Sequence, residues 1–172
     1  VLRAGRPEQK ATAYAARTLG SLVEGDEGHS RAAAIADAGA VEVLVGVLRA
    51  GRPEQEATAM AAMALANLAF GDEGRLTAII EAGALDALVG VLRTARPSQG
   101  ATAMAALALG NLTICGFGHI RALAIMKAGA FKPLVDVLRA GKPAEEVQDA
   151  SSKDAARCSG VLHVRAAAIV EA

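Results

Sequence analysis

The sequence predicts an all-α solenoid built from three-helix repeats. A Val-Leu-Arg motif followed by a proline turn occurs four times, beginning at Val1, Val47, Val91 and Val137, so that the starts lie 46, 44 and 46 residues apart. A fixed period of this size is typical of a solenoid, in which each unit buries its apolar face against the next. The composition agrees, because 42 of the 172 residues are alanine, the strongest helix former. No segment shows the alternating pattern of a strand.

The first helix of each unit is short and ends at an Ala-Gly-Ala joint. We expect it over residues 29–38, 75–82 and 119–128, and again from 163 to 172. Gly39, Gly83 and Gly129 stand at the joint, where a left-handed backbone ends a helix. The second helix is expected over residues 41–50, 85–94 and 131–140. It stops before a proline, which breaks one helix and suits the first turn of the next.

The third helix is the longest and is expected over residues 8–24, 54–70 and 98–115. Glu8 and Glu54 should lie in its first turn, where an acid complements the helix dipole. The fourth copy, residues 144–160, loses most of its apolar stripe, so it is either a degenerate end unit with a polar outer face or a poorly ordered segment.

These units make residues 1–172 a single continuous solenoid segment. Residues 1–24 end one repeat, residues 25–70, 71–115 and 116–160 are successive repeats, and residues 161–172 start another. Because both ends cut through a unit, we expect the chain to be part of a longer array.

Charge and cysteine content exclude several classes of protein. The 18 basic and 18 acidic residues cancel, so the electrostatic footprint of a nucleic-acid binder is missing. Cys115 and Cys158 occupy non-equivalent places in the repeat, which argues against a disulfide framework and favours an intracellular, cytoplasmic location, with the nucleus or another reducing compartment as the alternative. The uncharged stretch 97–118 is interpreted as a buried solenoid helix and not as a membrane span, because the equivalent stretch of the first unit carries Arg17.

The repeat resembles the armadillo-repeat family over nearly the whole chain. The resemblance rests on the Ala-Gly-Ala joint after a short helix, on the leucine and valine core of the second helix, and on a long third helix that ends in ALANLA at 64–69 or ALGNLT at 108–113. HEAT repeats are the nearest alternative, but their units have two helices, and the additional short helix here favours the armadillo type.

The resemblance implies a right-handed superhelix whose third helices line a concave groove that holds extended peptides. In this family an asparagine near the end of the third helix bonds to the peptide backbone. Asn67 and Asn111 match that position, and Ser21 replaces it in the first copy. Nuclear-import adaptors of the family often carry a tryptophan four residues before the asparagine. The chain has no tryptophan, which argues against recognition of basic nuclear-localisation peptides.

Helical spacing divides the third helix into a core face and a second stripe. Leu65 and Leu68 mark the core face, with Ala61 and Ala64. The second stripe contains Tyr14, Arg17, Ser21 and Glu24 in the first copy, Met60, Met63, Asn67 and Phe70 in the next, and Met104, Leu107, Asn111 and Ile114 in the third. The methionines are either further core or an adaptable apolar groove, since methionine suits surfaces that repack around a partner.

Our hypothesis for this stripe is that Asn67 and Asn111 fix a bound backbone while Met60, Met63, Met104 and Leu107 receive apolar side chains. Replacing both asparagines with alanine should then weaken binding and leave the melting temperature nearly unchanged.

The turns between helices segregate charge. Basic residues flank the joint between second and third helices, and this basic edge includes Arg6, Arg49, Arg52, Arg93 and Arg96. Asp26, Glu27, Asp72 and Glu73 occupy the opposite joint. The basic edge either complements helix C-termini or forms a docking ladder for an acidic partner or an anionic surface.

No set of residues indicates catalysis, a metal site, a cofactor or a small-molecule substrate. His29, His119 and His163 share one repeat position and should lie too far apart to bind one ion, while Cys115 and His119 supply only two ligands. We therefore expect a non-enzymatic scaffold or adaptor whose partner is a protein, held as an extended segment on the third helices. The alternatives are a structural subunit or spacer within a larger assembly and attachment to a lipid surface through the basic edge.

Overall fold

A computed structural model describes residues 9–24, 30–70, 73–96, 99–114 and 118–140 of the chain. All regular secondary structure in these ranges is helical, which confirms the predicted all-α class. The described helices are α1 (Lys10–Val23), α2 (Ser30–Asp37), α3 (Ala40–Ala50), α4 (Glu56–Leu68), α5 (Glu73–Glu81), α6 (Ala84–Thr94), α7 (Gly100–Ile114), α8 (Gly118–Lys127) and α9 (Phe131–Arg139).

Several predictions fall outside the described residues. They concern the fourth third-helix copy at 144–160, the repeat start at 161–172, and the residues Glu8, Arg6, Asp26, Glu27, His29, Asp72, Cys115, Cys158 and His163.

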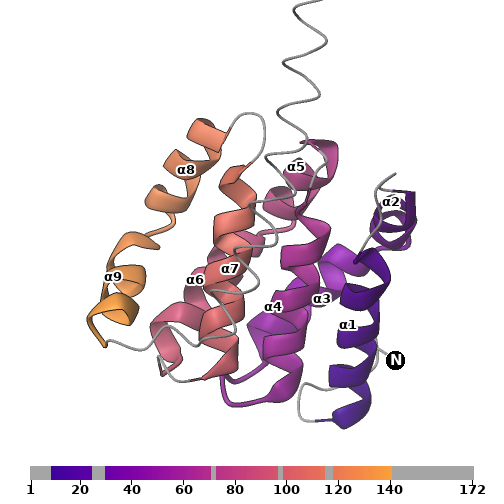
Figure 1. Cartoon of the computed structure of the whole chain (residues 1–172), viewed down its shortest axis with the longest axis horizontal. Helices are drawn as coiled ribbons and strands as arrows, with labels where there is room; N and C mark the ends of the chain where they lie inside the picture. Colours follow the sequence, from indigo (N-terminus) through magenta and orange to yellow (C-terminus); the bar gives the residue numbers. More distant parts are fainter. Residues whose placement is uncertain (1–8, 25–29, 71–72, 97–98, 115–117, 141–172) are drawn as a thin grey trace, which may run out of the picture.

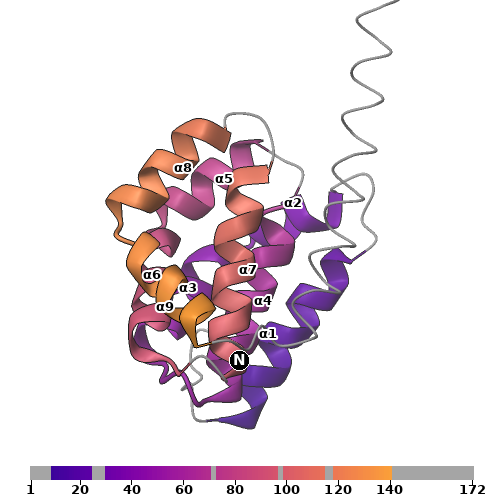
Figure 2. The ribbon, with the colours of Figure 1, turned by 60° about the vertical axis from the view of Figure 1, so that its left-hand side comes forward.

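The helices form two rows with a set of short helices along one end (Figure 1). The third helices α1, α4 and α7 stand side by side, and α4 packs against both of its neighbours. The second helices α3 and α6 lie behind them, α3 against α4 and α6 against α7. After a turn of 60°, α8 and α5 are both seen at the upper end, and α9 lies beside α6 (Figure 2). The two units described with both helices, 25–70 and 71–115, therefore each contribute one helix to each row.

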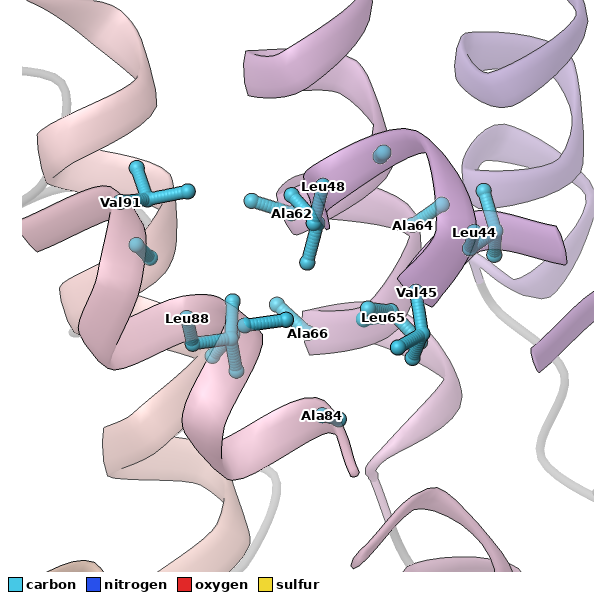
Figure 3. Close-up of a cluster of buried hydrophobic side chains, with 14 of the residues drawn as sticks. Leu44, Val45, Leu48, Ala62, Ala64, Leu65, Ala66, Ala84, Leu88 and Val91 are labelled. Atoms are coloured by element: carbon cyan, nitrogen blue, oxygen red, sulfur yellow. The ribbon is translucent and has the colours of Figure 1, made fainter. Parts of the chain in front are cut away.

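Alanine and leucine fill the space between the two rows. Ala62, Ala64 and Ala66 of α4 meet leucines and valines of α3 and α6, as Figure 3 shows. Leu65 and Leu68 are fully buried, as are Ala61 and Ala64, so the predicted core face of the third helix is confirmed. Alanine allows a close approach of helices, and the leucines supply most of the buried apolar area.

The joint between the first and second helices depends on glycine. Gly39, Gly83 and Gly129 have φ angles of 76°, 80° and 79°, which confirms the predicted left-handed backbone. In this conformation the first helix can end and the chain can turn within two residues, because glycine has no Cβ to clash. The second helices α3 and α6 then begin at Ala40 and Ala84, one residue earlier than predicted.

The third helices begin two residues later than predicted. The backbone N–H of Arg52 donates to Gln55 Oε1 at 2.7 Å, and Thr58 Oγ1 donates to the Arg52 carbonyl at 2.7 Å. These bonds hold residues 52–55 in a turn that precedes α4. Glu54 therefore lies before the helix and not in its first turn, where Glu56 stands instead. The same two bonds recur before α7, made by Gln99 and Thr102 with Arg96.

Residues 100–114 of the uncharged stretch form α7, whose buried residues include Ala105, Leu109 and Leu112. It is a buried solenoid helix, as predicted. Within the described ranges, no helix combines the length and the apolarity that a bilayer crossing requires.

Two glycines of the same unit should respond in opposite ways to alanine. Gly83→Ala places a Cβ on a left-handed backbone and against the Arg49 guanidinium, so we expect the free energy of unfolding to fall by about 2 kcal/mol. Gly90→Ala meets no atom within 4 Å in the middle of α6, and there alanine should stabilise by about 0.5–1 kcal/mol. Urea unfolding followed by circular dichroism measures both, and a destabilised Gly90→Ala would contradict the open surroundings of that site.

Candidate binding face of the third helices

The residues of the predicted stripe lie on α1, α4 and α7, the three helices that stand side by side. We call these residues the third-helix face: Tyr14, Arg17, Ser21 and the adjoining Glu24 on α1, Met60, Met63, Asn67 and the adjoining Phe70 on α4, and Met104, Leu107, Asn111 and Ile114 on α7. Equivalent members are separated by one repeat length, so they stand at matching heights on neighbouring helices.

Most of the third-helix face is accessible. Tyr14 is 54% exposed and Ile114 is 38% exposed, while Met60, Met63, Met104 and Leu107 are half-buried. The core leucines of the same helices, by contrast, are at most 2% exposed. The methionines therefore rest on the edge of the core and leave part of each side chain uncovered.

The two asparagines join neighbouring third helices. Asn67 Nδ2 donates to the Gly20 carbonyl of α1 at 3.1 Å, and Asn111 Nδ2 donates to the Ala66 carbonyl of α4 at 3.0 Å. Both acceptors occupy the same repeat position, so the bond repeats from unit to unit. The corresponding residue of α1 is Ser21, which is exposed.

These bonds bear on the predicted contact with a bound backbone. A side-chain amide has two N–H donors and one oxygen acceptor, and the helix-to-helix bond uses only one N–H. Asn67 is half-buried, whereas Asn111 is 3% exposed, so Asn67 is the more accessible of the two. The expectation that alanine leaves the melting temperature nearly unchanged is not supported, because each substitution removes an inter-helix hydrogen bond.

Arginines of the first helices donate hydrogen bonds to carbonyls at the ends of the third helices. Arg75 of α5 is buried, and it donates from Nε to the Leu68 carbonyl and from Nη2 to the Phe70 carbonyl, both at 2.7 Å. Arg121 of α8 donates to the Leu112 carbonyl at 3.4 Å, and Arg31 of α2 donates to the Glu24 carbonyl at 3.4 Å. The last carbonyls of a helix have no partner within the helix, and these guanidinium groups supply one.

The sequence analysis missed this role, although a signal was present. Arg31, Arg75 and Arg121 each stand eight residues before the joint glycine of their unit. A charged residue that recurs at one place in every first helix indicates a fixed polar partner.

An acidic residue of the opposite joint, Glu73, also forms a contact between units. Arg121 Nη2 forms an ion pair with the carboxylate of Glu73, which belongs to the preceding unit. The arginine is buried and the glutamate is partly exposed, so the pair ties the first helices α5 and α8 together at the edge of the solenoid.

Two arginines of the basic edge also donate hydrogen bonds to backbone carbonyls. Arg49 Nη2 donates to the carbonyls of Ala82 and Gly83 at 3.3 and 3.4 Å, and Arg93 Nη2 donates to the Ala128 carbonyl at 3.2 Å. Each of these arginines thus caps the first helix of the next unit, not its own helix. The side chains of Arg52 and Arg96 are exposed at the adjoining turn.

A hollow of about 450 Å³ borders α1, where it is lined by Tyr14, Arg17, Thr18, Ser21 and Leu22. Three of these residues belong to the third-helix face. The other two, Thr18 and Leu22, occupy the repeat positions of Ala64 and Leu68, which are buried in α4. Among the described residues, no group of three or more His, Cys, Asp or Glu side chains could hold a metal ion.

Comparisons with known proteins identify the class. No family model and no curated protein matches the sequence. An engineered protein from the Northeast Structural Genomics Consortium is 35% identical, with a TM-score of 0.68 over 87% of this chain and 55% of that one. Computationally designed armadillo repeat proteins for modular peptide recognition are 28% identical, with a TM-score of 0.66 over 80% of this chain and 54% of theirs.

A further solved structure holds a ligand. It is a designed armadillo repeat protein in complex with the peptide (KR)4, 30% identical, with a TM-score of 0.67 over 82% of this chain and 55% of that one. The chain therefore has the armadillo-repeat solenoid fold. It spans 56% and 55% of the length of two of the engineered structures that it matches and 33% of a third.

Removing the buried inter-helix amide should cost stability. Asn111→Ala leaves the Ala66 carbonyl without its donor, so we expect the free energy of unfolding to fall by about 1 kcal/mol. Ser21→Ala at the equivalent exposed position is the control and should change it by a few tenths at most. Urea unfolding compares the two variants, and wild-type stability in Asn111→Ala would show that the bond to Ala66 contributes nothing in solution.

The buried arginine should matter more than its exposed counterpart. Arg75→Met keeps an aliphatic side chain but removes two bonds from a charged donor, for which we expect a loss of about 3 kcal/mol. Arg31→Met, at the same repeat position on α2, removes a longer and exposed bond and should cost less than about 0.5 kcal/mol. Equal losses in thermal or urea unfolding would contradict the capping role assigned to Arg75.

Proposed function

We propose that the chain is a protein-binding scaffold that holds an extended segment of a partner across the third-helix face. The observation that carries this proposal is the row of half-exposed apolar side chains on two adjacent helices, Met60 and Met63 on α4 with Met104 and Leu107 on α7. A designed protein of the same fold, solved with a bound peptide, supports it.

The chemistry of this row suits a peptide. Methionine is unbranched and polarizable, so it can repack around side chains of different shape. An extended peptide that crosses the row would cover apolar surface on α4 and α7 together, at about 25 cal/mol for each Å² removed from water. Because one contact contributes little, binding requires several repeats to act at once.

Asparagine provides a polar group beside the apolar row. Asn67 uses one N–H to bond Gly20, which leaves the second N–H as a donor for a backbone carbonyl of the partner. Under this proposal Asn67 and Asn111 both stabilise the solenoid, and the bound segment lies beside them.

The alternative function is a structural subunit or spacer in a larger assembly. It would use the outer surfaces and leave the third-helix face uninvolved, so substitutions on that face separate the two functions.

The test uses peptides selected from a random dodecapeptide library displayed on phage. The affinity of a selected peptide is measured by isothermal titration calorimetry for the wild type and for the double variant Met63→Gln with Leu107→Gln. Glutamine keeps the approximate size of both side chains but disfavours burial under an apolar group, so we expect binding to weaken about tenfold. Ala78→Gln, on the exposed surface of α5, is the control and should bind like the wild type.

Thermal unfolding of each variant shows whether the fold is intact. Selected peptides that bind the double variant as tightly as the wild type would place binding elsewhere. A library from which no peptide is enriched would favour the structural subunit.

A further inference from the structure

Three of the four methionines of the chain lie on the third-helix face. They are Met60 and Met63 on α4 and Met104 on α7, whereas Met126 belongs to α8. A methionine thioether can be oxidised to a sulfoxide, which is polar, and a sulfoxide reductase can reverse the change. The buried core of alanine, leucine, valine and isoleucine contains no methionine among the described residues. The apolar row therefore carries a reactive atom that the core does not.

The methionines of α4 are accessible within the stack and not only at its ends. A third helix packs on each side of α4, with α1 on one side and α7 on the other (Figure 1). Met60 and Met63 are nevertheless half-buried, whereas Leu65 and Leu68 of the same helix are fully buried. A thioether has no proton to lose, so access to its sulfur largely decides how fast an oxidant in solution reacts with it.

Met63 differs from Met60 in what its side chain contacts. Met60 packs against the buried core. The methyl end of Met63 reaches the contact between α4 and α1, where a Cβ built on Gly20 would lie 3.3 Å from Met63 Cε. The carbonyl of Gly20 accepts the hydrogen bond of Asn67. The sulfur of Met63, which is bonded to that methyl group, thus lies beside the residue that joins the two helices.

Met63 is also a neighbour of Asn67 on α4. The two residues are four positions apart, a spacing that places side chains on the same face of a helix. Asn67 donates one amide N–H to Gly20 and has a second N–H to donate. A thioether is a weak acceptor for this group, whereas the oxygen of a sulfoxide is polar. Oxidation of Met63 would therefore place an acceptor next to the donor that the proposed function assigns to the partner.

We infer that Met63 is a modification site, at which a peroxide oxidises the thioether to a sulfoxide and thereby releases the bound segment. This inference rests on the proposed function and adds a means of regulation to it. The sulfur attacks one peroxide oxygen, the O–O bond breaks and an S–O bond forms. The departing hydroxide takes the proton of the transferred oxygen and leaves as water, so sulfur loses the two electrons that the peroxide gains.

The sulfoxide acts on two contacts of the face at once. It replaces part of the apolar surface of α4 with a polar group, and it competes with the partner's backbone for the second N–H of Asn67. The modification is confined to one copy of the repeat, because the same position holds Arg17 on α1 and Leu107 on α7. Met63→Leu therefore copies the residue of α7 and removes the sulfur with little change in volume.

Two variants test the inference, with a dodecapeptide selected as described above as the probe. Met63→Leu keeps the other three methionines, and a triple variant with Met60→Leu, Met104→Leu and Met126→Leu keeps Met63 alone. Each folded variant receives the same dose of hydrogen peroxide, and isothermal titration calorimetry compares its affinity with that of the untreated variant. We expect binding to weaken about tenfold in the triple variant and to stay within about twofold in Met63→Leu.

Peptide mapping by mass spectrometry shows which sulfurs have reacted. In the wild type Met63 should be oxidised before Met60 and Met104, because both of these pack against the core. Both variants retain Cys115 and Cys158, so cysteine oxidation cannot cause a difference between them. Methionine sulfoxide reductase should restore the affinity of the oxidised triple variant.

The outcomes separate this inference from the proposed function. A triple variant that binds the peptide equally well with and without the sulfoxide would overturn the inference and leave the proposed function intact. Oxidation of Met63 no faster than that of Met60 would do the same, as would a loss of binding that thermal unfolding traces to an unfolded chain. If the library yields no peptide, the proposed function fails and the inference falls with it.

Discussion

The stacking of the third helices depends on how closely their backbones approach one another. A Cβ placed on Gly20 would lie 3.2 Å from the Cα of Ala64, so the contact between α1 and α4 tolerates almost no side chain at this point. Small residues continue this contact into α7, where Ala105 and Ala108 are buried. Only at this separation can a short asparagine side chain reach the carbonyl of the neighbouring helix. The apolar core and the inter-helix hydrogen bonds are therefore consequences of one spacing.

Polar interactions complete the stack where the helices end. Arg75 and Arg121 satisfy the last carbonyls of the third helices, and Arg49 and Arg93 satisfy those of the next first helix. Charged side chains thus serve as caps between units, while the middle of each unit is almost entirely apolar. This division explains why the basic edge is less free to dock a partner than its sequence pattern indicates.

The sequence predicted the helices and their order well because both follow from local signals. The glycines of the Ala-Gly-Ala joint indicate their left-handed backbone directly, and helical spacing separated Leu65 in the core from Met63 on the accessible stripe. The interactions that the sequence did not predict join residues far apart in the chain. Asn67 bonds to Gly20, 47 residues away, and nothing in either segment alone indicates that pairing. The turn held by Gln55 and Thr58 was also missed, since the preceding proline suggested that the helix starts at once.

The asparagine bonds have a consequence for how such a chain can change in length. The two bonds span 47 and 45 residues, and the two-residue difference matches the shorter second unit, whose deletion falls just after Gly74, at the start of α5. The pairing of donor with acceptor has therefore survived a deletion without shifting by a helical turn. The asparagine donor of each copy fits the carbonyl acceptor of the copy before it. A duplicated unit inserted between existing ones could therefore bond to the acceptor of the preceding unit and to the donor of the following unit. Insertion of whole units would lengthen the third-helix face and preserve the spacing between neighbouring third helices.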